Sequence, residues 1–274
     1  MTHVCIDRSG PVGTIRLDRP ERHNALDVAM AQDLRHAALS LVRDAEIRVV
    51  VLRGLPGVFC SGVDLKYVRE GGFAADLGYL QPVSFNRPAG SGAIFKQILE
   101  YLNATIVEIR RAPKPVVAAV EGVAAAGGMG LALCCDLVLA SDRARFEWAY
   151  SRTGLSGAES ATFFLPRLLG FRRAADLALL DEPLDARAAH HLGLVSSVGA
   201  QDDFDAHLEE RVARLLTRSS PALARAKALL NRASGMDELE EHLTAELDAL
   251  VASADGADFA SGLERFFDRP AEAR

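Results

Sequence analysis

The stretch that most restricts the fold of this chain is residues 114–146, KPVVAAVEGVAAAGGMGLALCCDLVLASDRARF. It begins with an almost continuous apolar run, 116–120 (VVAAV), which follows two prolines and is typical of a buried strand. Glycines come next, at positions 122, 127, 128 and 130, and they lead into an apolar segment, 129–135, that predicts a helix. A buried strand that passes through a turn of small residues into an apolar helix indicates an α/β fold.

The start of that helix is a candidate ligand site. Glycine lets a ligand approach the backbone closely, and the first N–H groups of a helix have no internal partner and lie at its positive end. Such an arrangement can hold an anion or an oxyanion that develops during a reaction. Tight packing between helix and strand explains the same glycines, and their spacing alone does not decide between the two. A P-loop is not indicated, because no Gly-Lys-Ser/Thr sequence follows.

The rest of the chain divides into a mixed first part and a helical last part. Short β-branched runs predict strands over 12–17 and 47–53, and the spacing of apolar residues between them predicts a helix over 27–43, with Asp27 as its cap. Helical patterns dominate after Arg167; they cover 172–180, 185–192, 203–217, 221–232, 237–252 and 256–267. We therefore expect an α/β core over residues 1–198 and a C-terminal helical region over residues 199–274.

Charge and composition argue against several classes of protein. A net charge of −6 and an aromatic content of 6% do not suit a nucleic-acid-binding surface. No apolar run reaches the roughly 18 residues of a membrane helix, and the first residues lack the pattern of a signal peptide, so a cytoplasmic location is expected. The cysteines show no CxxC spacing, so we expect no disulfide framework, metal site or redox cofactor; they are Cys5, Cys60, Cys134 and Cys135.

A second glycine turn precedes the first. Residues 57–66 (GVFCSGVDLK) predict a strand end followed by a turn that carries Asp64 and Lys66. The N–H groups of this turn could face a polar ligand, although the same sequence is usual at a solvated helix start. Residues 70–92 are rich in glycine and weakly periodic, and we expect them to form a mobile loop of the kind that often acts as a functional lid.

Together these stretches resemble the crotonase (enoyl-CoA hydratase/isomerase) superfamily. The matching segments occur in the expected order over most of residues 12–198: they are 17–26 (LDRPERHNAL), 48–66, 114–146 and 165–198. The resemblance implies a spiral of ββα units, a C-terminal helical region that aids self-association as a homotrimer or a dimer of trimers, and an acyl-CoA thioester as substrate. Fatty-acid metabolism is one of the pathways that such enzymes serve, and coenzyme A enters only as part of the substrate.

The resemblance also assigns site residues. The family's two backbone donors to the thioester oxygen fall at Val63 and Gly127, in agreement with the two turns found above. Two fixed donors stabilise an enolate strongly where water is excluded. The coenzyme A contacts carried over are Arg22, His23, Ala25 and Lys66, with Arg269 reaching the nucleotide of a neighbouring subunit. Ordinary surface charge is an equal explanation for Arg22 and Arg269.

The pattern departs from the family at the hydratase glutamates. These fall at Gly130 and Tyr150, so both carboxylates are missing. Hydration needs one group to activate water and another to protonate the α-carbon; glycine can do neither, and tyrosine, with an ordinary pKa near 10, is a poor base at neutral pH. Substituting glutamate at both positions is expected to raise hydration if the scaffold is otherwise intact.

Glu159 is the leading replacement. Some family isomerases carry a catalytic aspartate in this loop, which falls one residue earlier, at Ala158. We therefore predict that Glu159 is a single acid/base, with a dipole-stabilised glutamate at a helix start as the alternative. Tyr150 is predicted to donate a hydrogen bond to a polar group of the substrate, with a half-buried aromatic as the alternative.

Two classes of function remain open. The first is an acyl-CoA enzyme, either a hydratase-like lyase or, with one carboxylate, an isomerase, a decarboxylase or a thioester hydrolase. The second is a catalytically silent acyl-CoA binder or assembly subunit, for which the loss of both glutamates would also be expected.

Overall fold

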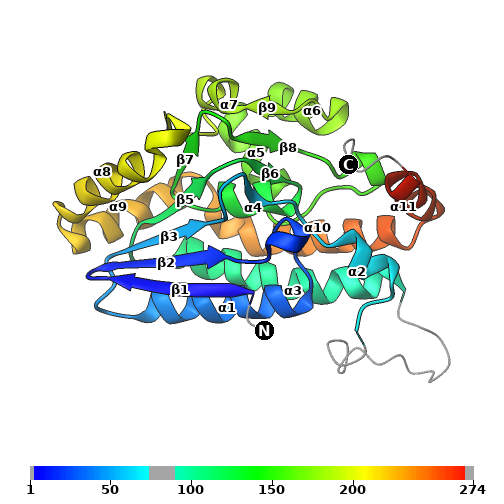
Figure 1. Cartoon of the computed structure of the whole chain (residues 1–274), viewed down its shortest axis with the longest axis horizontal. Coiled ribbons are helices and arrows are strands. Elements are labelled where there is room, and N and C mark those ends of the chain that lie inside the picture. The colour runs from blue at the N-terminus through cyan, green and yellow to red at the C-terminus, as the bar shows by residue number, and fades with distance from the viewer. Residues whose placement is uncertain (1–2, 74–89, 269–274) are drawn as a thin grey trace.

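The large sheet forms the centre of the molecule. The computed structural model describes residues 3–73 and 90–268, so most of the loop expected over 70–92, and Arg269, lie outside the described residues. The strand order is β1-β2-β3-β5-β7-β10, and every pair is parallel except the antiparallel β1 and β2 (Figure 1). The bounds are β1 Val4–Ser9, β2 Val12–Leu17, β3 Val49–Arg53, β5 Val116–Val120, β7 Leu137–Ser141 and β10 Ser197–Gly199.

A smaller sheet lies beside the ends of these strands. Its order is β4-β6-β8-β9, with bounds β4 Val58–Cys60, β6 Val123–Ala125, β8 Arg145–Glu147 and β9 Leu184–Asp185. Three times the chain runs from a strand of the large sheet into one of the small sheet and then into a helix: β3–β4, β5–β6 and β7–β8 are the strand pairs. The expected arrangement of ββα units is thus confirmed.

Helices cover both faces of the large sheet. The large sheet has a separate hydrophobic core on each face. Alternate side chains of β3 and β5 belong to different cores, because successive residues of a strand point to opposite faces. Val49, Val51 and Val117 pack with α8 (Phe204–Leu216), and their neighbours pack in the main core with α1 (Val28–Arg43) and α3 (Ser91–Arg111). The remaining helices are α2 Leu65–Arg69, α4 Gly127–Leu133, α5 Ala161–Leu169, α6 Phe171–Leu180, α7 Ala186–Leu192, α9 Ser220–Ala233, α10 Leu239–Ala254 and α11 Ala257–Asp268.

The predicted elements agree with these bounds, with small differences. The strand over 116–120 and the helices after Arg167 are found as expected, and Asp27 does cap α1, since its side chain accepts a hydrogen bond from the N–H of Met30 at 2.8 Å. The apolar helix expected over 129–135 spans 127–133. Within the described ranges, no helix is long and apolar enough to cross a membrane.

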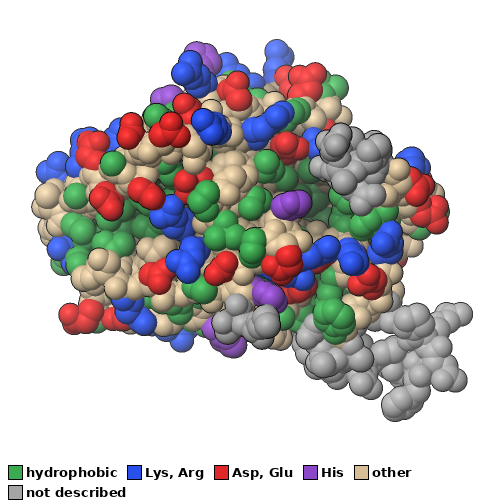
Figure 2. Space-filling view, viewed as in Figure 1, with side chains coloured by type: hydrophobic (Ala, Val, Ile, Leu, Met, Phe, Trp, Pro, Cys, Tyr) green, Lys and Arg blue, Asp and Glu red, His purple; other side chains and the backbone are tan. Residues whose placement is uncertain are grey.

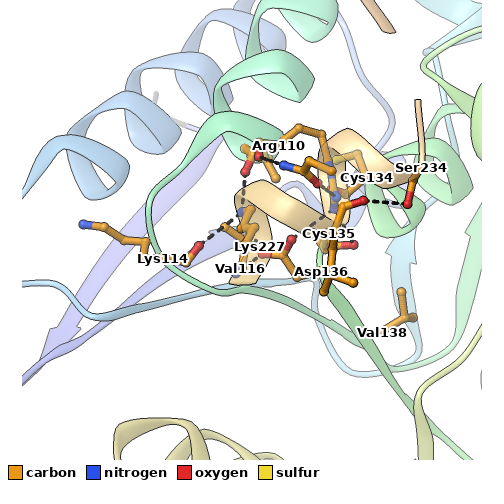
Figure 3. Close-up of polar contacts among 12 residues, drawn as sticks. Arg110, Lys114, Val116, Cys134, Cys135, Asp136, Val138, Lys227 and Ser234 are labelled. Atoms are coloured by element: carbon orange, nitrogen blue, oxygen red, sulfur yellow. Dashed lines mark hydrogen bonds and ion pairs between the residues drawn. The ribbon is translucent and has the colours of Figure 1, made fainter. Parts of the chain in front are cut away.

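The C-terminal helices pack directly on the core. Helix α10 lies along α3, and Figure 1 shows the two helices next to each other. Helix α9 is fixed by Lys227, a buried side chain that forms an ion pair with Asp136 at 2.7 Å and donates a hydrogen bond to the carbonyl of Ile109 at 2.9 Å (Figure 3). Asp136 also pairs with Arg110 of α3 at 3.1 Å. A shared, half-buried carboxylate therefore joins α3, α9 and the segment before β7.

Candidate active site

The two glycine turns meet at one place. Gly62 has φ +90°, a conformation that favours glycine, and a Cβ added to it would lie 2.8 Å from Ala126 Cβ and 3.3 Å from the backbone nitrogen of Gly127. In the part of the chain that the structure describes, no hydrogen-bond acceptor is recorded for the N–H of Val63 or of Gly127. The turn before α2 and the start of α4 thus bring two available backbone donors into the same region.

The start of α4 fits tightly against β4. A Cβ added to Gly128 would lie 2.1 Å from the carbonyl oxygen of Cys60, which is a backbone atom that cannot move cheaply. The residue before this helix, Ala126, has φ +47°, which is uncommon for a residue with a side chain. The glycines therefore serve close packing, as one of the two interpretations expected, and the same packing fixes the direction of the Gly127 N–H group.

The segment predicted to bind coenzyme A lies beside the Val63 turn. The N–H of Leu26 donates to the Gly62 carbonyl at 2.8 Å, and the N–H of Asp64 donates to the Leu26 carbonyl at 2.9 Å. The N–H of Ser61 donates to the carbonyl of His23 at 3.2 Å. Arg22, His23 and Ala25 are therefore held next to one of the two proposed donors.

Asp64 anchors this region electrostatically. Its buried carboxylate pairs with Arg19 at 3.1 Å, accepts a hydrogen bond from Arg22 Nε at 3.0 Å and caps α2 by accepting from the N–H groups of Lys66 and Tyr67. Burial acts to raise the pKa of Asp64, but the hydrogen bond from Arg22 and the one from Tyr67 outweigh it, so the pKa lies below the ordinary value. The Asp64 carboxylate is thus charged at neutral pH, and its contacts fix the backbone directly after Val63.

Replacing Asp64 by asparagine is expected to destabilise the fold by about 2 kcal/mol, because Arg19 and the partly exposed Arg22 lose their shared carboxylate. Urea unfolding of the two proteins measures the difference. The matched control is Glu70→Gln, which removes only an exposed pair with Lys66 and should cost less than about 0.5 kcal/mol. Equal losses in both variants would show that the Asp64 cluster has no special role.

Glu159 lies at the same place as Gly127. Its side chain is 1% exposed, and a Cβ added to Gly127 would lie 2.8 Å from Glu159 Oε1. Glu159 and Ser160 have φ +51° and +66°, so two successive residues adopt the left-handed conformation just before α5 begins at Ala161. The carboxyl is therefore buried against the start of α4. Glu159 also lies two residues before α5, so a glutamate stabilised by the dipole at a helix start is still an alternative to the acid/base role.

Tyr150 contacts this carboxyl directly. Its hydroxyl donates a short hydrogen bond to Glu159 Oε2 and lies 3.0 Å from the carbonyl oxygen of Ala158. Tyr150 is 4% exposed and its ring makes an edge contact with Trp148, with 4.9 Å between the centroids. In this structure the hydroxyl is engaged by protein atoms, and its hydrogen bond to a substrate group stays a prediction.

Burial raises the pKa of Glu159 to about 8. The hydrogen bond from Tyr150 lowers it, and the nearby carboxyl of Glu246 raises it. A carboxyl with such a pKa exists in both protonation states near neutral pH, which is what a general acid/base requires. Burial, followed by the charge of Glu159, also raises the pKa of Tyr150, so its hydroxyl stays protonated.

Glu246 is a site residue that the sequence did not reveal. It lies on α10, is buried, and accepts hydrogen bonds from the N–H groups of Ser160 at 2.8 Å and Thr162 at 2.9 Å. It thereby holds the loop that carries Glu159. The sequence offered no signal, because Glu246 is one of several acidic residues in a helical run of ordinary appearance.

The structure corrects the expectation for Gly130. A Cβ added there would lie 2.0 Å from the carbonyl oxygen of Glu159, so glutamate cannot be accommodated unless the loop backbone moves. Restoring the pair of glutamates at positions 130 and 150 is therefore not expected to restore hydration, since the scaffold does not stay intact. The space of the missing carboxylate is occupied by the loop that supplies Glu159.

Two predicted coenzyme A contacts remain, Lys66 and Arg269. Lys66 is exposed and lies 3.8 Å from Glu70, whereas Arg269 is outside the described residues. Figure 2 shows a hollow lined by hydrophobic side chains to the right of α4, facing the side on which α2 and α11 lie. Within the described ranges, no group of three or more His, Cys, Asp or Glu side chains is arranged to hold a metal ion.

Comparison with known proteins points in one direction. The family model described as enoyl-CoA hydratase/isomerase matches residues 7–86 and 91–272. A 4-chlorobenzoyl coenzyme A dehalogenase from Arthrobacter sp is 30% identical over 96% of this chain and 90% of the relative. A 1,2-epoxyphenylacetyl-CoA isomerase from Escherichia coli K12 is 33% identical over 93% of this chain and 91% of the relative.

A solved structure resembles the whole chain. The crystal structure of an enoyl-CoA hydratase from Mycobacterium avium subsp. paratuberculosis K-10 superposes with a TM-score of 0.84 at 29% identity, covering 98% of this chain and 96% of that one. The names of these relatives all refer to coenzyme A thioesters and differ in the reaction.

Proposed function

The chain belongs to the enoyl-CoA hydratase/isomerase family, and from this premise we propose that it is an acyl-CoA isomerase in which Glu159 alone transfers the proton. The observation that carries the proposal is the position of Glu159 Oε1 beside Gly127 in a buried site. One carboxyl at this place can serve proton transfer, whereas hydration of a conjugated double bond calls for a second group that the site lacks at positions 130 and 150.

The proposed reaction moves one proton. The thioester oxygen accepts hydrogen bonds from the N–H groups of Val63 and Gly127, and the Glu159 carboxylate removes a proton from the α-carbon. The electron pair of the broken C–H bond moves onto the thioester oxygen as an enolate, which the two donors stabilise. Protonated Glu159 then returns the proton to the γ-carbon, so a 3-enoyl thioester becomes a conjugated 2-enoyl thioester.

Coenzyme A binding and self-association are part of the same proposal. Arg22, His23, Ala25 and Lys66 are proposed to hold coenzyme A beside the Val63 turn, with Arg269 contributed by a neighbouring subunit. Self-association as a homotrimer or a dimer of trimers is supported by large apolar side chains that one chain leaves exposed. They include Phe171, Leu179, Leu180, Leu229 and Leu230.

The proposal is tested with a 3-enoyl-CoA thioester in deuterated water. We expect the absorbance of the conjugated thioester to appear. NMR should show deuterium entering at the γ-carbon in those turnovers in which protonated Glu159 exchanges its proton with solvent before returning it. Crotonyl-CoA, supplied at high enzyme concentration, should be hydrated slowly or not at all.

Two other results would replace the proposal. Binding of the thioester without any exchange at the α-carbon would indicate a silent binder, and release of free coenzyme A would indicate a hydrolase. A dehalogenase relative at 30% identity makes a halogenated aryl-CoA a useful third probe, with halide release as its readout.

A further inference from the structure

The hydroxyl of Tyr150 faces two acceptors and carries one hydrogen. It makes a short contact with Glu159 Oε2, and it lies 3.0 Å from the carbonyl oxygen of Ala158. All three residues are buried, so none of these atoms can rely on solvent for a partner. A buried polar group without a hydrogen bond is costly, and the arrangement must therefore satisfy Glu159 both with and without its proton.

Both states are satisfied by one hydroxyl. When Glu159 is ionised, the Tyr150 hydrogen points to Oε2. When Glu159 holds the substrate's proton on Oε1, Oε2 is still an acceptor and the Tyr150 hydrogen stays on it. If the proton moves to Oε2, it can be donated to the tyrosine oxygen while the Tyr150 hydrogen turns to the Ala158 carbonyl. In either state Oε2 is held by Tyr150, which leaves Oε1, the oxygen beside Gly127, free for a substrate.

We propose that Tyr150 is a positioning residue that holds Glu159 in both protonation states and reserves Oε1 as its reacting oxygen. The proposal rests on the proposed function, because it assigns Tyr150 to the acid/base cycle of Glu159. It also explains why a tyrosine occupies the second hydratase position: its hydroxyl acts on another carboxyl and not on water.

Other titratable groups near Glu159 can also affect the pKa of its carboxyl. Cys60 of β4 is buried nearby, and its thiol has a pKa raised to about 12 by burial, so it stays neutral. Glu246 of α10 adds negative charge from the other side, and His242 of the same helix lies 3.7 Å from Glu246. Of these groups, Tyr150 is the one recorded as donating a hydrogen bond to the Glu159 carboxyl.

The test is the variant Tyr150→Phe, which keeps the ring and removes the hydroxyl. The Glu159 carboxyl is titrated by 13C NMR in protein labelled at glutamate, with Glu159→Gln used to assign its signal. Losing a hydrogen bond to the charged form should raise the pKa of Glu159 by about one to two units. Turnover of a 3-enoyl-CoA at pH 7 should then fall about 10- to 100-fold and recover as the pH rises.

Tyr101→Phe is the matched control. Tyr101 also uses its hydroxyl in a hydrogen bond, accepting from Gln32 Nε2 at 3.0 Å, but it lies on α3 and is not in contact with Glu159. It should leave the titration and the pH profile unchanged. If Tyr150→Phe does not fold, difluorotyrosine at position 150 serves instead: its more acidic hydroxyl is a stronger donor and should lower the pKa of Glu159.

An unchanged Glu159 titration, with turnover reduced equally at every pH, would overturn the positioning role and leave a packing role for Tyr150. The proposed function fails by a different result, full turnover by Glu159→Gln. The NMR titration does not depend on turnover, so the two failures are distinguishable.

Discussion

Replacing Glu159 by glutamine is expected to lower kcat for 3-enoyl-CoA isomerisation by a factor of about 10² to 10⁴, the usual contribution of a general acid/base. Glutamine has nearly the same shape but cannot accept and return a proton. The effect should be on kcat with little change in KM, because the proposed donors at Val63 and Gly127 and the proposed coenzyme A contacts are not altered by the substitution. Steady-state kinetics followed by the absorbance of the conjugated thioester measures it.

Two controls separate lost chemistry from lost structure. Glu108→Gln removes an α3 carboxylate that pairs with exposed Arg43 of α1, and it should keep full activity. Stability is the other control. The folded-state pKa of Glu159 is raised to about 8, so its contribution to stability is present at low pH and is lost as the pH rises through about 8. Glutamine does not titrate, so Glu159→Gln should be at least as stable as the parent at pH 9.

The pH dependence of the parent enzyme gives an independent check. Since the carboxylate is the form that removes the α-proton, kcat/KM should rise with pH and level off above about 8. A profile that levels off near pH 5 would mean that the Glu159 carboxyl is not the base, whatever the activity of the glutamine variant.

Replacing Gly130 by alanine is expected to destabilise the fold by about 3 kcal/mol or more. The added methyl group would lie 2.0 Å from the carbonyl oxygen of Glu159, and relief requires a shift of the loop backbone. That loop is held by Glu246 through the N–H groups of Ser160 and Thr162, so it cannot shift freely. Chemical denaturation gives the loss in stability, and Gly130→Glu should behave worse and yield little folded protein.

The control is alanine at Gly90, the residue before α3. Gly90 has φ −64° and ψ 161°, which suits any residue, and its nearest neighbour would be a side-chain oxygen of Asp255 at 3.2 Å. This substitution should change stability by less than about 0.5 kcal/mol. A Gly130→Ala protein as stable as Gly90→Ala would mean that the loop can retreat, and a hydratase could then be built on this scaffold.

The sequence identified the turns of the site because glycine leaves a visible pattern. Gly62 and Gly127 were found from spacing and from family resemblance, and their convergence is seen in the structure. The close approach of the Glu159 loop to Gly130 was not predictable. The absence of a glutamate at position 130 does not indicate which segment occupies the space instead. Glu246 was not predictable either, because the contact joins residues 86 positions apart, Ser160 and Glu246.

Strand β1 and helix α3 are among the elements that were missed, and they were missed for opposite reasons. Strand β1 has one buried residue, Val4, and its polar residues pair with β2 at the edge of the sheet, so no apolar alternation marks it. Helix α3 does show helical spacing of buried residues, including Ile94, Ile98 and Leu102. It begins directly after a glycine-rich segment and its N-cap, Gly90, makes no side-chain hydrogen bond, so nothing in the sequence marked its start.

The hold of Glu246 on the Glu159 loop has a consequence for biosynthesis. Glu246 leaves the ribosome well after the other residues of the proposed site, which are Val63, Gly127, Tyr150 and Glu159. The nascent chain therefore carries these residues before Glu246 is present to hold the Glu159 loop. The Glu159 loop is therefore complete once α10 has docked, and a chain that stops before that helix would leave the N–H groups of Ser160 and Thr162 without the carboxylate that accepts from them.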